Sequence, residues 1–483
     1  TRHARHDRNT AATGIDTLRQ MTTVSRRALL RALGVNALAA GGFPAAVLRR
    51  AGPGGPPKPL KPGAVTSDWT SFLGPSHNAT SPETQLRRTL PPALLWEYPK
   101  GTGYATPAVA GDTLVFLHRM RDEEVVECLH AERGDSRWQF RYNTEFEDRY
   151  GYNNGPRASP VIDGDFVYVM SAEGLLHCLR LASGAVVWSR DLRVEYKAQQ
   201  DFFGIASTPL IEEGLLIVNV GAPGGPSVMA CDKVTGHEVW RAGTEWGPSY
   251  ASPVPAVVHG KRRVFVFAGG ESTPPTGGLM SIDPETGHVD FSFPWRSRTY
   301  ESVNASCPVV FDDKVFISAS YRAGSALLQI RPDFSHEVLW TTREFGLHFS
   351  TAIYHDGYLY GFEGRNEPDA NLACLDAATG KVVWRETPEW TDSLDGRPQI
   401  VGTYRGSLLH VDGRFLCLGE LGHLLWLDLS PKGYRQIART WLFPARESWG
   451  LPVLSRGLLY VTQNTRDVTR VTGPRLLCYD MRA

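Results

Sequence analysis

The sequence lacks the cysteine patterns that build disulfide frameworks and zinc sites. Its 7 cysteines include no adjacent pair and no Cys-x-x-Cys spacing, the usual marks of redox or structural metal sites. Five of them recur at the same place in successive repeats, namely Cys128, Cys178, Cys231, Cys374 and Cys478. Equivalent places in different repeat units lie far apart, so we expect unpaired, buried strand cysteines.

Other absences exclude whole classes of function. The sequence contains no Walker loop, dinucleotide fingerprint, Gly-x-Ser-x-Gly elbow or His-Glu-x-x-His motif. No charge of one sign dominates the whole chain, but residues 1–62 hold 11 of the 51 Lys and Arg and 2 of the 51 Asp and Glu. The remainder therefore has 40 basic and 49 acidic groups, a net charge of −9. An acidic domain of this kind does not suggest a nucleic acid partner.

The first 50 residues are interpreted as an upstream extension followed by a twin-arginine-type export signal. Met21 is the expected start, and Arg26-Arg27 precedes a weakly apolar segment. An ordinary basic N-terminus or a short membrane anchor is the alternative, because no clear cleavage site follows. After this segment no apolar run is long enough to span a bilayer. We therefore expect an exported protein of the periplasm or cell envelope, without a transmembrane domain beyond the signal segment.

One repeated segment organises the rest of the chain. Residues 374–384 have the pattern of a strand end, a turn that Asp376 opens and Gly380 closes, and a new strand that reaches Trp384. Aromatic residues recur in this place at intervals of 42 to 57 residues: Trp96, Trp138, Trp188, Trp240, Phe291, Trp340, Trp384 and Trp441. A period of this length indicates a repeat architecture.

A second landmark, a small residue and a proline before an apolar strand, falls between the aromatics, as at Thr106-Pro107 and Ser159-Pro160. Each repeat thus holds about four short strands, the content of one propeller blade. The last repeat lacks its own outer strand, whereas the strand at Trp96 precedes the first repeat. The sequence therefore predicts an all-β, eight-bladed β-propeller of four-stranded antiparallel blades over residues 68–483, closed by an N-terminal strand. A Pro- and Gly-rich linker over residues 51–67 precedes it.

The repeats carry a family resemblance. The segments 230–240 and 374–384 resemble the PQQ-type β-propeller repeat, which quinoprotein dehydrogenases share with the outer-membrane assembly protein BamB. Four further stretches are similar to exported bacterial propellers of the PQQ-binding-like type: 68–75, 149–157, 301–306 and 354–361. The resemblance covers nearly everything from Asp68 onward and implies the fold. It does not imply an activity, because one fold hosts many functions.

The resemblance also implies that the loops before the innermost strands surround one mouth of a central channel. We expect a ligand site there, formed by Tyr152, Asn153, Arg157, Phe203, Tyr250, Glu301, Asn304 and His348. Arg157 is suited to a carboxylate, and Glu301 and Asn304 carry oxygen donors suited to Ca²⁺ if that ion is bound. Turn formation, surface ion pairing or packing at the channel wall is the ordinary alternative for each residue.

Three hypotheses about function remain. The first, which we favour, is a non-catalytic exported scaffold, without a cofactor, that binds another protein or a small ligand on the loop face. The second is a PQQ-dependent oxidoreductase with PQQ and Ca²⁺ in the channel, as the resemblance to quinoprotein dehydrogenases implies. The missing adjacent cysteine pair and the lack of a recognisable catalytic Asp argue against it. The third is carbohydrate or small-anion binding at the channel mouth, which the mixture of aromatic, amide and arginine side chains suggests.

Overall fold

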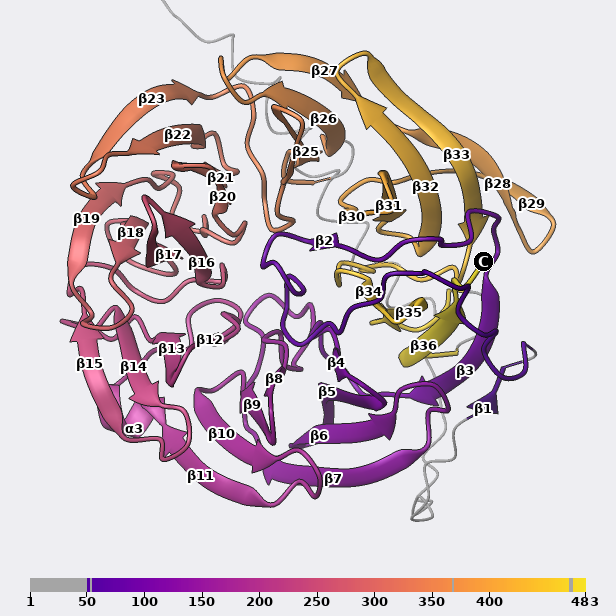
Figure 1. Cartoon of the computed structure of the whole chain (residues 1–483), viewed down its shortest axis with the longest axis horizontal. Coiled ribbons are helices and arrows are strands. Elements are labelled where there is room, and N and C mark those ends of the chain that lie inside the picture. Colours follow the sequence, from indigo (N-terminus) through magenta and orange to yellow (C-terminus); the bar gives the residue numbers. More distant parts are fainter. Residues whose placement is uncertain (1–49, 53, 367–368, 469–471) are drawn as a thin grey trace, which may run out of the picture. The chain divides into compact units, whose positions relative to one another are not determined.

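The computed structural model describes residues 50–52, 54–366, 369–468 and 472–483, which all lie in one compact unit. These residues form a ring of eight β-sheet blades around a central axis (Figure 1). The prediction of an eight-bladed propeller is therefore confirmed. The predicted extension and export signal over residues 1–50 lie outside the described residues, except for Arg50 at the start of β1. Among the described residues, no helix is long and apolar enough to cross a membrane.

The first four blades follow one another along the chain, each running from the innermost to the outermost strand. Blades 1 and 2 comprise β4 (Ala108–Ala110), β5 (Thr113–Met120), β6 (Glu123–His130), β7 (Ser136–Asn143), then β8 (Val161–Asp163), β9 (Phe166–Met170), β10 (Leu175–Arg180) and β11 (Val186–Asp191). Blades 3 and 4 comprise β12 (Leu210–Glu212), β13 (Leu215–Asn219), β14 (Val228–Asp232), β15 (Glu238–Ala242), then β16 (Val254–Val258), β17 (Lys261–Ala268), β18 (Gly278–Ile282) and β19 (Val289–Pro294). The short helix α3 (Leu192–Tyr196) follows β11.

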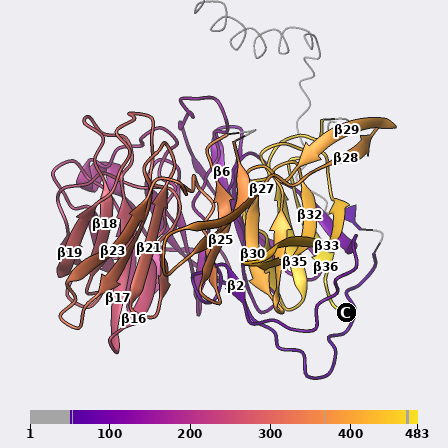
Figure 2. The same ribbon diagram turned by 90° about the horizontal axis from the view of Figure 1, so that it is seen from above.

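The remaining blades keep the same order, with additions at the edges. Blades 5 and 6 comprise β20 (Val309–Phe311), β21 (Lys314–Ala319), β22 (Gly324–Ile330), β23 (His336–Thr342), then β24 (Ile353–His355), β25 (Tyr358–Glu363), β26 (Asn371–Asp376) and β27 (Val382–Glu386). A hairpin of β28 (Glu389–Leu394) and β29 (Arg397–Gly402) is inserted before blade 7, which comprises β30 (Ser407–Val411), β31 (Arg414–Leu418), β32 (His423–Ser430) and β33 (Gly433–Trp441). In Figure 2 this hairpin lies on the opposite side of the ring from β2 (Thr80–Ser81).

The last blade closes the ring with a strand from the beginning of the chain. Strands β34 (Val453–Ser455), β35 (Leu458–Gln463) and β36 (Arg475–Asp480) are completed by β3 (Ala93–Pro99), and β1 (Arg50–Ala51) adds an outer strand. Trp96 of β3 is opposite Cys478 of β36. The indole of Trp96 is fully buried and donates a hydrogen bond to the carbonyl of Ala131 at 3.0 Å. The predicted closure by an N-terminal strand is confirmed.

The turn between the third and fourth strands explains why Asp, Thr and Gly recur. In blade 6, the Asp376 carboxylate accepts hydrogen bonds from the backbone N–H groups of Ala378 at 2.8 Å and Thr379 at 3.1 Å. Gly380 then adopts a φ of 69°, in the left-handed region that glycine tolerates best. Hydrogen bonding by a short acidic side chain and a left-handed glycine together close the turn.

Five of the repeat tryptophans cover the turn glycine of the next blade. A Cβ atom on Gly380 would lie 2.6 Å from the ring of Trp340, whose indole donates to the carbonyl of Ala377 at 2.9 Å. The same contact joins Trp96 to Gly134, Trp138 to Gly184, Trp188 to Gly236 and Trp240 to Gly287. The Gly and the Trp of the repeat are therefore contact partners between blades.

Blade 7 corrects one expectation about the repeat. In blade 6 the repeat aromatic Trp384 lies opposite Cys374 on the neighbouring strand. In blade 7 the equivalent positions are occupied by Ala438, opposite Trp426. Trp441 lies three residues further along β33 and stacks on His423 with ring centroids 4.5 Å apart. The Asp-led turn with its left-handed glycine is missing there, so spacing alone placed Trp441 in the wrong register.

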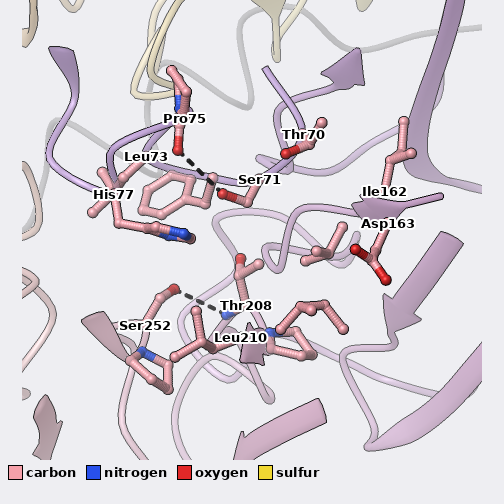
Figure 3. A pocket seen from close by; sticks show the side chains of 16 residues that line it. Thr70, Ser71, Leu73, Pro75, His77, Ile162, Asp163, Thr208, Leu210 and Ser252 are labelled. Carbon is pink, nitrogen blue, oxygen red and sulfur yellow. Dashed lines mark hydrogen bonds between the residues drawn. The ribbon is translucent and has the colours of Figure 1, made fainter. Parts of the chain in front are cut away.

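The segment that follows the linker closes one end of the channel. Trp69 exchanges backbone hydrogen bonds with Val109 of blade 1 at 2.7 and 2.9 Å, and β2 pairs in parallel with β30 of blade 7. Between these anchors the segment passes the inner strands of blades 2 to 4, leaving a cavity of about 180 Å³ (Figure 3). We call residues 69–81 the plug, because they close this end of the channel.

The small residue of the second landmark connects neighbouring blades. The backbone N–H of Ser159 donates to the hydroxyl of Thr208 at 3.0 Å, and that of Thr208 donates to the hydroxyl of Ser252 at 3.0 Å. The backbone N–H groups of Thr106 and Cys307 donate in the same way to Ser159 and Thr351. A chain of hydrogen bonds therefore joins the innermost strands. All seven cysteines are free and buried, as expected.

Candidate functional site

The channel above the plug holds a pocket of about 280 Å³. Phe72, Leu73 and Ala79 of the plug line it at one end, and loops from all eight blades form its wall. The plug thus turns an open channel into a pocket with one mouth. Sites of this kind, concave and largely apolar with a few polar groups, are typical of small-ligand binding.

The wall is built from one position that repeats in every blade. This position lies two residues before the small residue of the second landmark, and its side chain faces the pocket in all eight cases: Tyr104, Arg157, Ala206, Tyr250, Ala305, Phe349, Arg405 and Trp449. The chain enters each innermost strand in the same way, so the same register position points to the axis each time. The pocket is therefore a consequence of the repeat, and the blades differ in which side chain they place at this position.

Six of the eight predicted site residues line this pocket: Tyr152, Arg157, Phe203, Tyr250, Glu301 and His348. The other two have structural contacts instead. The side-chain oxygen of Asn153 accepts the backbone N–H of Gly155 at 2.9 Å. Asn304 is fully buried, and its amide donates to the carbonyls of Ala268 at 2.8 Å and Trp295 at 2.9 Å.

Aromatic rings form most of the wall. Trp449 packs against Tyr104, Phe349 and Tyr152 with centroid distances of 5.2, 5.4 and 6.0 Å. On another part of the wall, Phe203 and Tyr250 lie 5.5 Å apart, and the Tyr250 hydroxyl accepts the backbone N–H of Phe203 at 3.1 Å. Rings in such mutual contact present fixed apolar faces to a bound molecule.

Two of the three arginines in the wall are paired with buried carboxylates. Arg157 donates to Asp148 at 2.6 Å and to the carbonyl of Phe203 at 2.9 Å. Arg405 donates to Glu420 at 3.0 Å and lies over the ring of Trp449 at 4.7 Å. Since Asp148 and Glu420 are almost completely buried, they neutralise these two guanidinium groups in place.

The polar groups at the mouth are less constrained. Glu301 and Arg365 are exposed and bring one charge of each sign to the wall. Arg365 lies 4.4 Å over the ring of Tyr321. Burial lowers the pKa of His348 to about 3, so its imidazole is neutral at ordinary pH and offers a hydrogen-bond donor or acceptor without charge.

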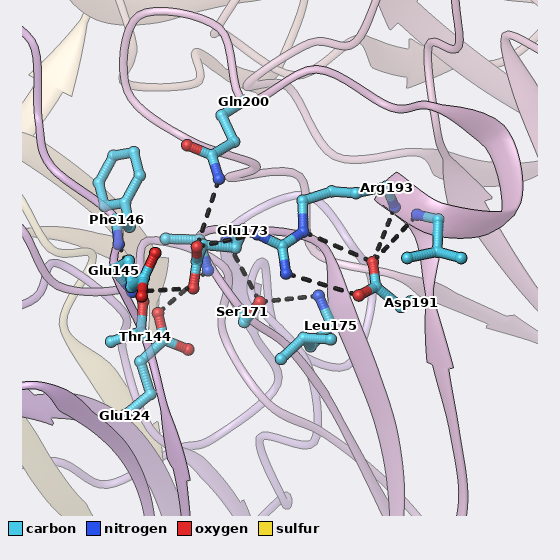
Figure 4. A network of polar contacts seen from close by, with 12 residues as sticks. Glu124, Thr144, Glu145, Phe146, Ser171, Glu173, Leu175, Asp191, Arg193 and Gln200 are labelled. Carbon is cyan, nitrogen blue, oxygen red and sulfur yellow. Dashed lines mark hydrogen bonds and ion pairs between the residues drawn. The ribbon is translucent and has the colours of Figure 1, made fainter.

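A polar network holds the loops that flank Phe203 (Figure 4). The buried carboxylate of Glu173 accepts hydrogen bonds from the backbone N–H of Glu145 at 3.2 Å, from Arg193 at 2.9 Å and from the amide of Gln200 at 3.4 Å. One carboxylate thereby joins the loop after β7, helix α3 and the loop that leads into the pocket. This part of the wall is fixed before any ligand binds.

The donor set predicted for Ca²⁺ does not come together. The Asn304 amide donates to carbonyls inside blade 4, whereas Glu301 is exposed at the mouth of the pocket. In the part of the chain that the structure describes, no group of three or more His, Cys, Asp and Glu residues is arranged to hold a metal ion. A hard cation prefers six to eight oxygen donors, which these two residues do not supply.

Several wall residues were not predicted. Tyr104, Phe349, Arg405 and Trp449 follow the same rule as Arg157, two residues before the landmark, so the period of the repeat contained the signal for them. Tyr321 and Arg365 come from the loops between the second and third strands of blades 5 and 6. No periodic pattern in the sequence marks those loops.

Comparison with known proteins agrees with this architecture. The family model described as outer membrane protein assembly factor BamB matches residues 121–386. BamB from Moraxella catarrhalis is similar in structure, with a TM-score of 0.53 and 14% identity over 81% of this chain and 98% of that chain. No curated protein matches the sequence significantly.

Two dehydrogenases share the fold at similar distance. A europium-containing methanol dehydrogenase has a TM-score of 0.58 and 12% identity over 82% of this chain and 89% of that chain. Quinohemoprotein alcohol dehydrogenase from Comamonas testosteroni has a TM-score of 0.58 and 13% identity over 86% of this chain and 81% of that chain. At such identities the likeness shows the fold alone. Because the family match spans more than half of the 483 residues, the chain belongs to the family described as outer membrane protein assembly factor BamB.

Proposed function

We propose that this protein is a non-catalytic binding scaffold of the cell envelope whose channel pocket holds a small ligand. The observation that carries the proposal is the ring of eight equivalent wall positions above the plug, which the chain fills with three tyrosine or phenylalanine rings, one tryptophan and two arginines. The description of the family as an outer membrane assembly factor supports an envelope location and a protein partner on the loop face.

The charge balance of the wall favours an uncharged ligand with hydroxyl groups, such as a sugar ring. Arg157 and Arg405 are already paired with Asp148 and Glu420, so they offer N–H donors and flat faces rather than net positive charge. Aromatic faces bind the apolar C–H side of a sugar, while amide, imidazole and guanidinium groups bind its hydroxyls. This observation favours the carbohydrate hypothesis over the small-anion hypothesis for the channel pocket.

The quinoprotein hypothesis fits the wall less well. PQQ would supply a redox-active quinone when bound, and the aromatic wall offers stacking faces for its ring system. Its several carboxylates, however, need positive charge that buried acids do not already neutralise. Among the described residues of the wall, only Arg365 provides this, and Glu301 and Asn304 do not form a Ca²⁺ site with each other. We derive no reaction step through this cofactor.

Calorimetric titration of the full chain with a panel of monosaccharides and disaccharides tests the proposal. We expect saturable binding of at least one sugar. Binding should weaken about tenfold or more in Trp449→Ala, because the variant removes a stacking face and its contacts with three neighbouring rings. Trp441→Ala is the matched control, since this tryptophan lies outside the pocket. Equal loss in both variants, or no binding of any sugar, would contradict the proposal.

A further inference from the structure

A second cleft opens beside the channel pocket, between blades 4 and 5. It has a volume of about 700 Å³. It is lined by residues 294–299 from the end of β19 onward, residues 321–323 between β21 and β22, and residues 341–343 at the end of β23 and just after it. Tyr321 lines both this cleft and the channel pocket, so the two sites are neighbours on the loop face. We call it the arginine cleft, because four of its twelve lining residues are Arg296, Arg298, Arg322 and Arg343.

The positive charge of the arginine cleft is not balanced within its wall. Among the described residues that line it, none is Asp or Glu. Arg298, Arg322 and Arg343 are exposed, and within the described part of the chain none of the three forms an ion pair with a carboxylate. In the channel pocket, by contrast, Arg157 and Arg405 each have a buried acidic partner. Guanidinium groups gathered without acids repel one another unless an anion lies between them.

Arg296 fixes the inner wall of the cleft. Its Nε donates to the hydroxyl of Ser302 at 2.9 Å, and its Nη2 donates to the Ser302 carbonyl. Burial lowers the pKa of Arg296 to about 10, and the nearby Asp201 opposes that shift. This arginine is therefore already engaged with the protein, which leaves the three exposed arginines to meet a ligand.

The turn that carries Arg322 holds two consecutive non-glycine residues at positive φ. Tyr321 and Arg322 both have positive φ, 58° and 63°, and the turn is closed by the bond from the Ala323 N–H to the Ser320 carbonyl at 3.2 Å. Two-residue hairpin turns of this type strongly favour Asn-Gly, because side chains with a bulky Cβ are strained there. Strain of this kind tends to collect at functional sites. Here the turn places Tyr321 in the wall of the channel pocket and Arg322 in the wall of the arginine cleft.

We propose that the arginine cleft binds the phosphate group of a small organic phosphate monoester through Arg298, Arg322 and Arg343. A guanidinium group matches the geometry of phosphate oxygens in a bidentate manner, and a monoester carries nearly two negative charges at neutral pH. The cleft is larger than inorganic phosphate requires, and Trp295 and Tyr321 supply ring surface for the organic part of the ligand. This site is separate from the sugar site proposed for the channel.

Calorimetric titration of the full chain with glucose 6-phosphate, and separately with inorganic phosphate, tests this site. We expect saturable binding of both, tighter for the ester, and a loss of about tenfold or more in the double variant Arg298→Ala and Arg322→Ala. Arg397→Ala is the control, because Arg397 is an exposed arginine on β29 outside the cleft. Like each substitution in the double variant, it removes one positive charge from the surface. Trp449→Ala should leave the binding of inorganic phosphate unchanged, because inorganic phosphate has no sugar ring for the channel pocket, so failure of this site and failure of the channel site are distinguishable.

A second variant separates binding from stability. Arg322→Gly removes the guanidinium and also relieves the positive φ, so it should raise the melting temperature while weakening phosphate binding. Co-sedimentation with phosphatidylglycerol vesicles, against phosphatidylcholine vesicles, distinguishes a lipid source of phosphate from a soluble one. The proposal is overturned if neither phosphate binds, if the double variant binds like the original protein, or if the protein sediments with phosphatidylglycerol in a manner that glucose 6-phosphate does not compete away.

Discussion

At the scale of single residues, the contact between a turn glycine and the tryptophan of the preceding blade recurs between neighbouring blades. A Cβ on Gly184 would lie 2.5 Å from the ring of Trp138, and the residue has a φ of 71°. Gly164, in the same blade, also has a positive φ of 55°, but a Cβ there would meet nothing within 4 Å. The two glycines thus separate the cost of backbone strain from the cost of overpacking.

We predict that Gly184→Ala lowers the free energy of unfolding by about 2 to 4 kcal/mol, whereas Gly164→Ala lowers it by about 1 kcal/mol. The first substitution adds a steric conflict with Trp138 to the strain of a left-handed alanine, and the second adds the strain alone. Equilibrium denaturation of both variants in the same denaturant measures the difference. Equal losses would show that the indole ring moves aside at no cost.

At the scale of elements, the innermost strands are joined by hydrogen bonds from a backbone N–H of one blade to a side chain of the next. Thr208 accepts the N–H of Ser159 and donates its own N–H to Ser252, with both distances 3.0 Å. Thr208→Val keeps the shape of the side chain but leaves the buried Ser159 N–H without its acceptor. We expect a loss of about 1 to 3 kcal/mol in the free energy of unfolding.

Thr208→Ser is the matched control for this prediction, because it retains the hydroxyl that accepts the hydrogen bond. It should be less destabilising than Thr208→Val, although it removes a buried methyl group. Thermal unfolding of the three proteins gives the order directly. If the serine variant is the less stable of the two, packing rather than the hydrogen bond joins these strands.

Strands, turns and blade number follow from the period of Asp, Gly and aromatic residues, because those residues make the same contacts in successive blades. Trp441 was assigned to the wrong register because the blade 7 turn lacks the Asp and the left-handed Gly, so only the spacing of the aromatic residues was left to define the register. Asn304 carries a side-chain oxygen suited to a metal ion, but its amide group donates hydrogen bonds to two backbone carbonyls within the fold.

The pocket itself was only partly predictable. The wall position two residues before each landmark is periodic, so the position that Arg157 occupies could also have identified Tyr104 and Trp449. The arginine cleft was not, since its residues come from three loops whose meeting depends on the packing of blades 4 and 5. Loops that are not equivalent by the repeat do not recur at a fixed spacing, so the sequence gives no periodic signal for the contacts between them.

At the scale of the described ring, stability depends on closure by β3. Trp96 joins the first and last parts of the chain, because it pairs with β36 and its indole is covered by blade 1. We predict that Trp96→Ala lowers the free energy of unfolding by about 3 to 5 kcal/mol, the range for removal of a fully buried aromatic side chain. Trp441→Ala should cost less, since its ring is partly exposed and outside the repeat register. A larger loss for Trp441→Ala in denaturant titrations would contradict this role of β3.

The central claim is that the channel pocket holds an organic ligand without quinone chemistry. Titration of the full chain with PQQ, with and without Ca²⁺, tests it most directly when quinone absorbance and melting temperature are followed together. We expect no saturable PQQ binding and no effect of Ca²⁺ at concentrations that saturate a quinoprotein dehydrogenase. Two of the three wall arginines are paired with buried carboxylates, and no Ca²⁺ donor set forms among the described residues. Saturable, Ca²⁺-dependent PQQ binding that raises the melting temperature and is lost in Glu301→Gln would contradict it and support an oxidoreductase.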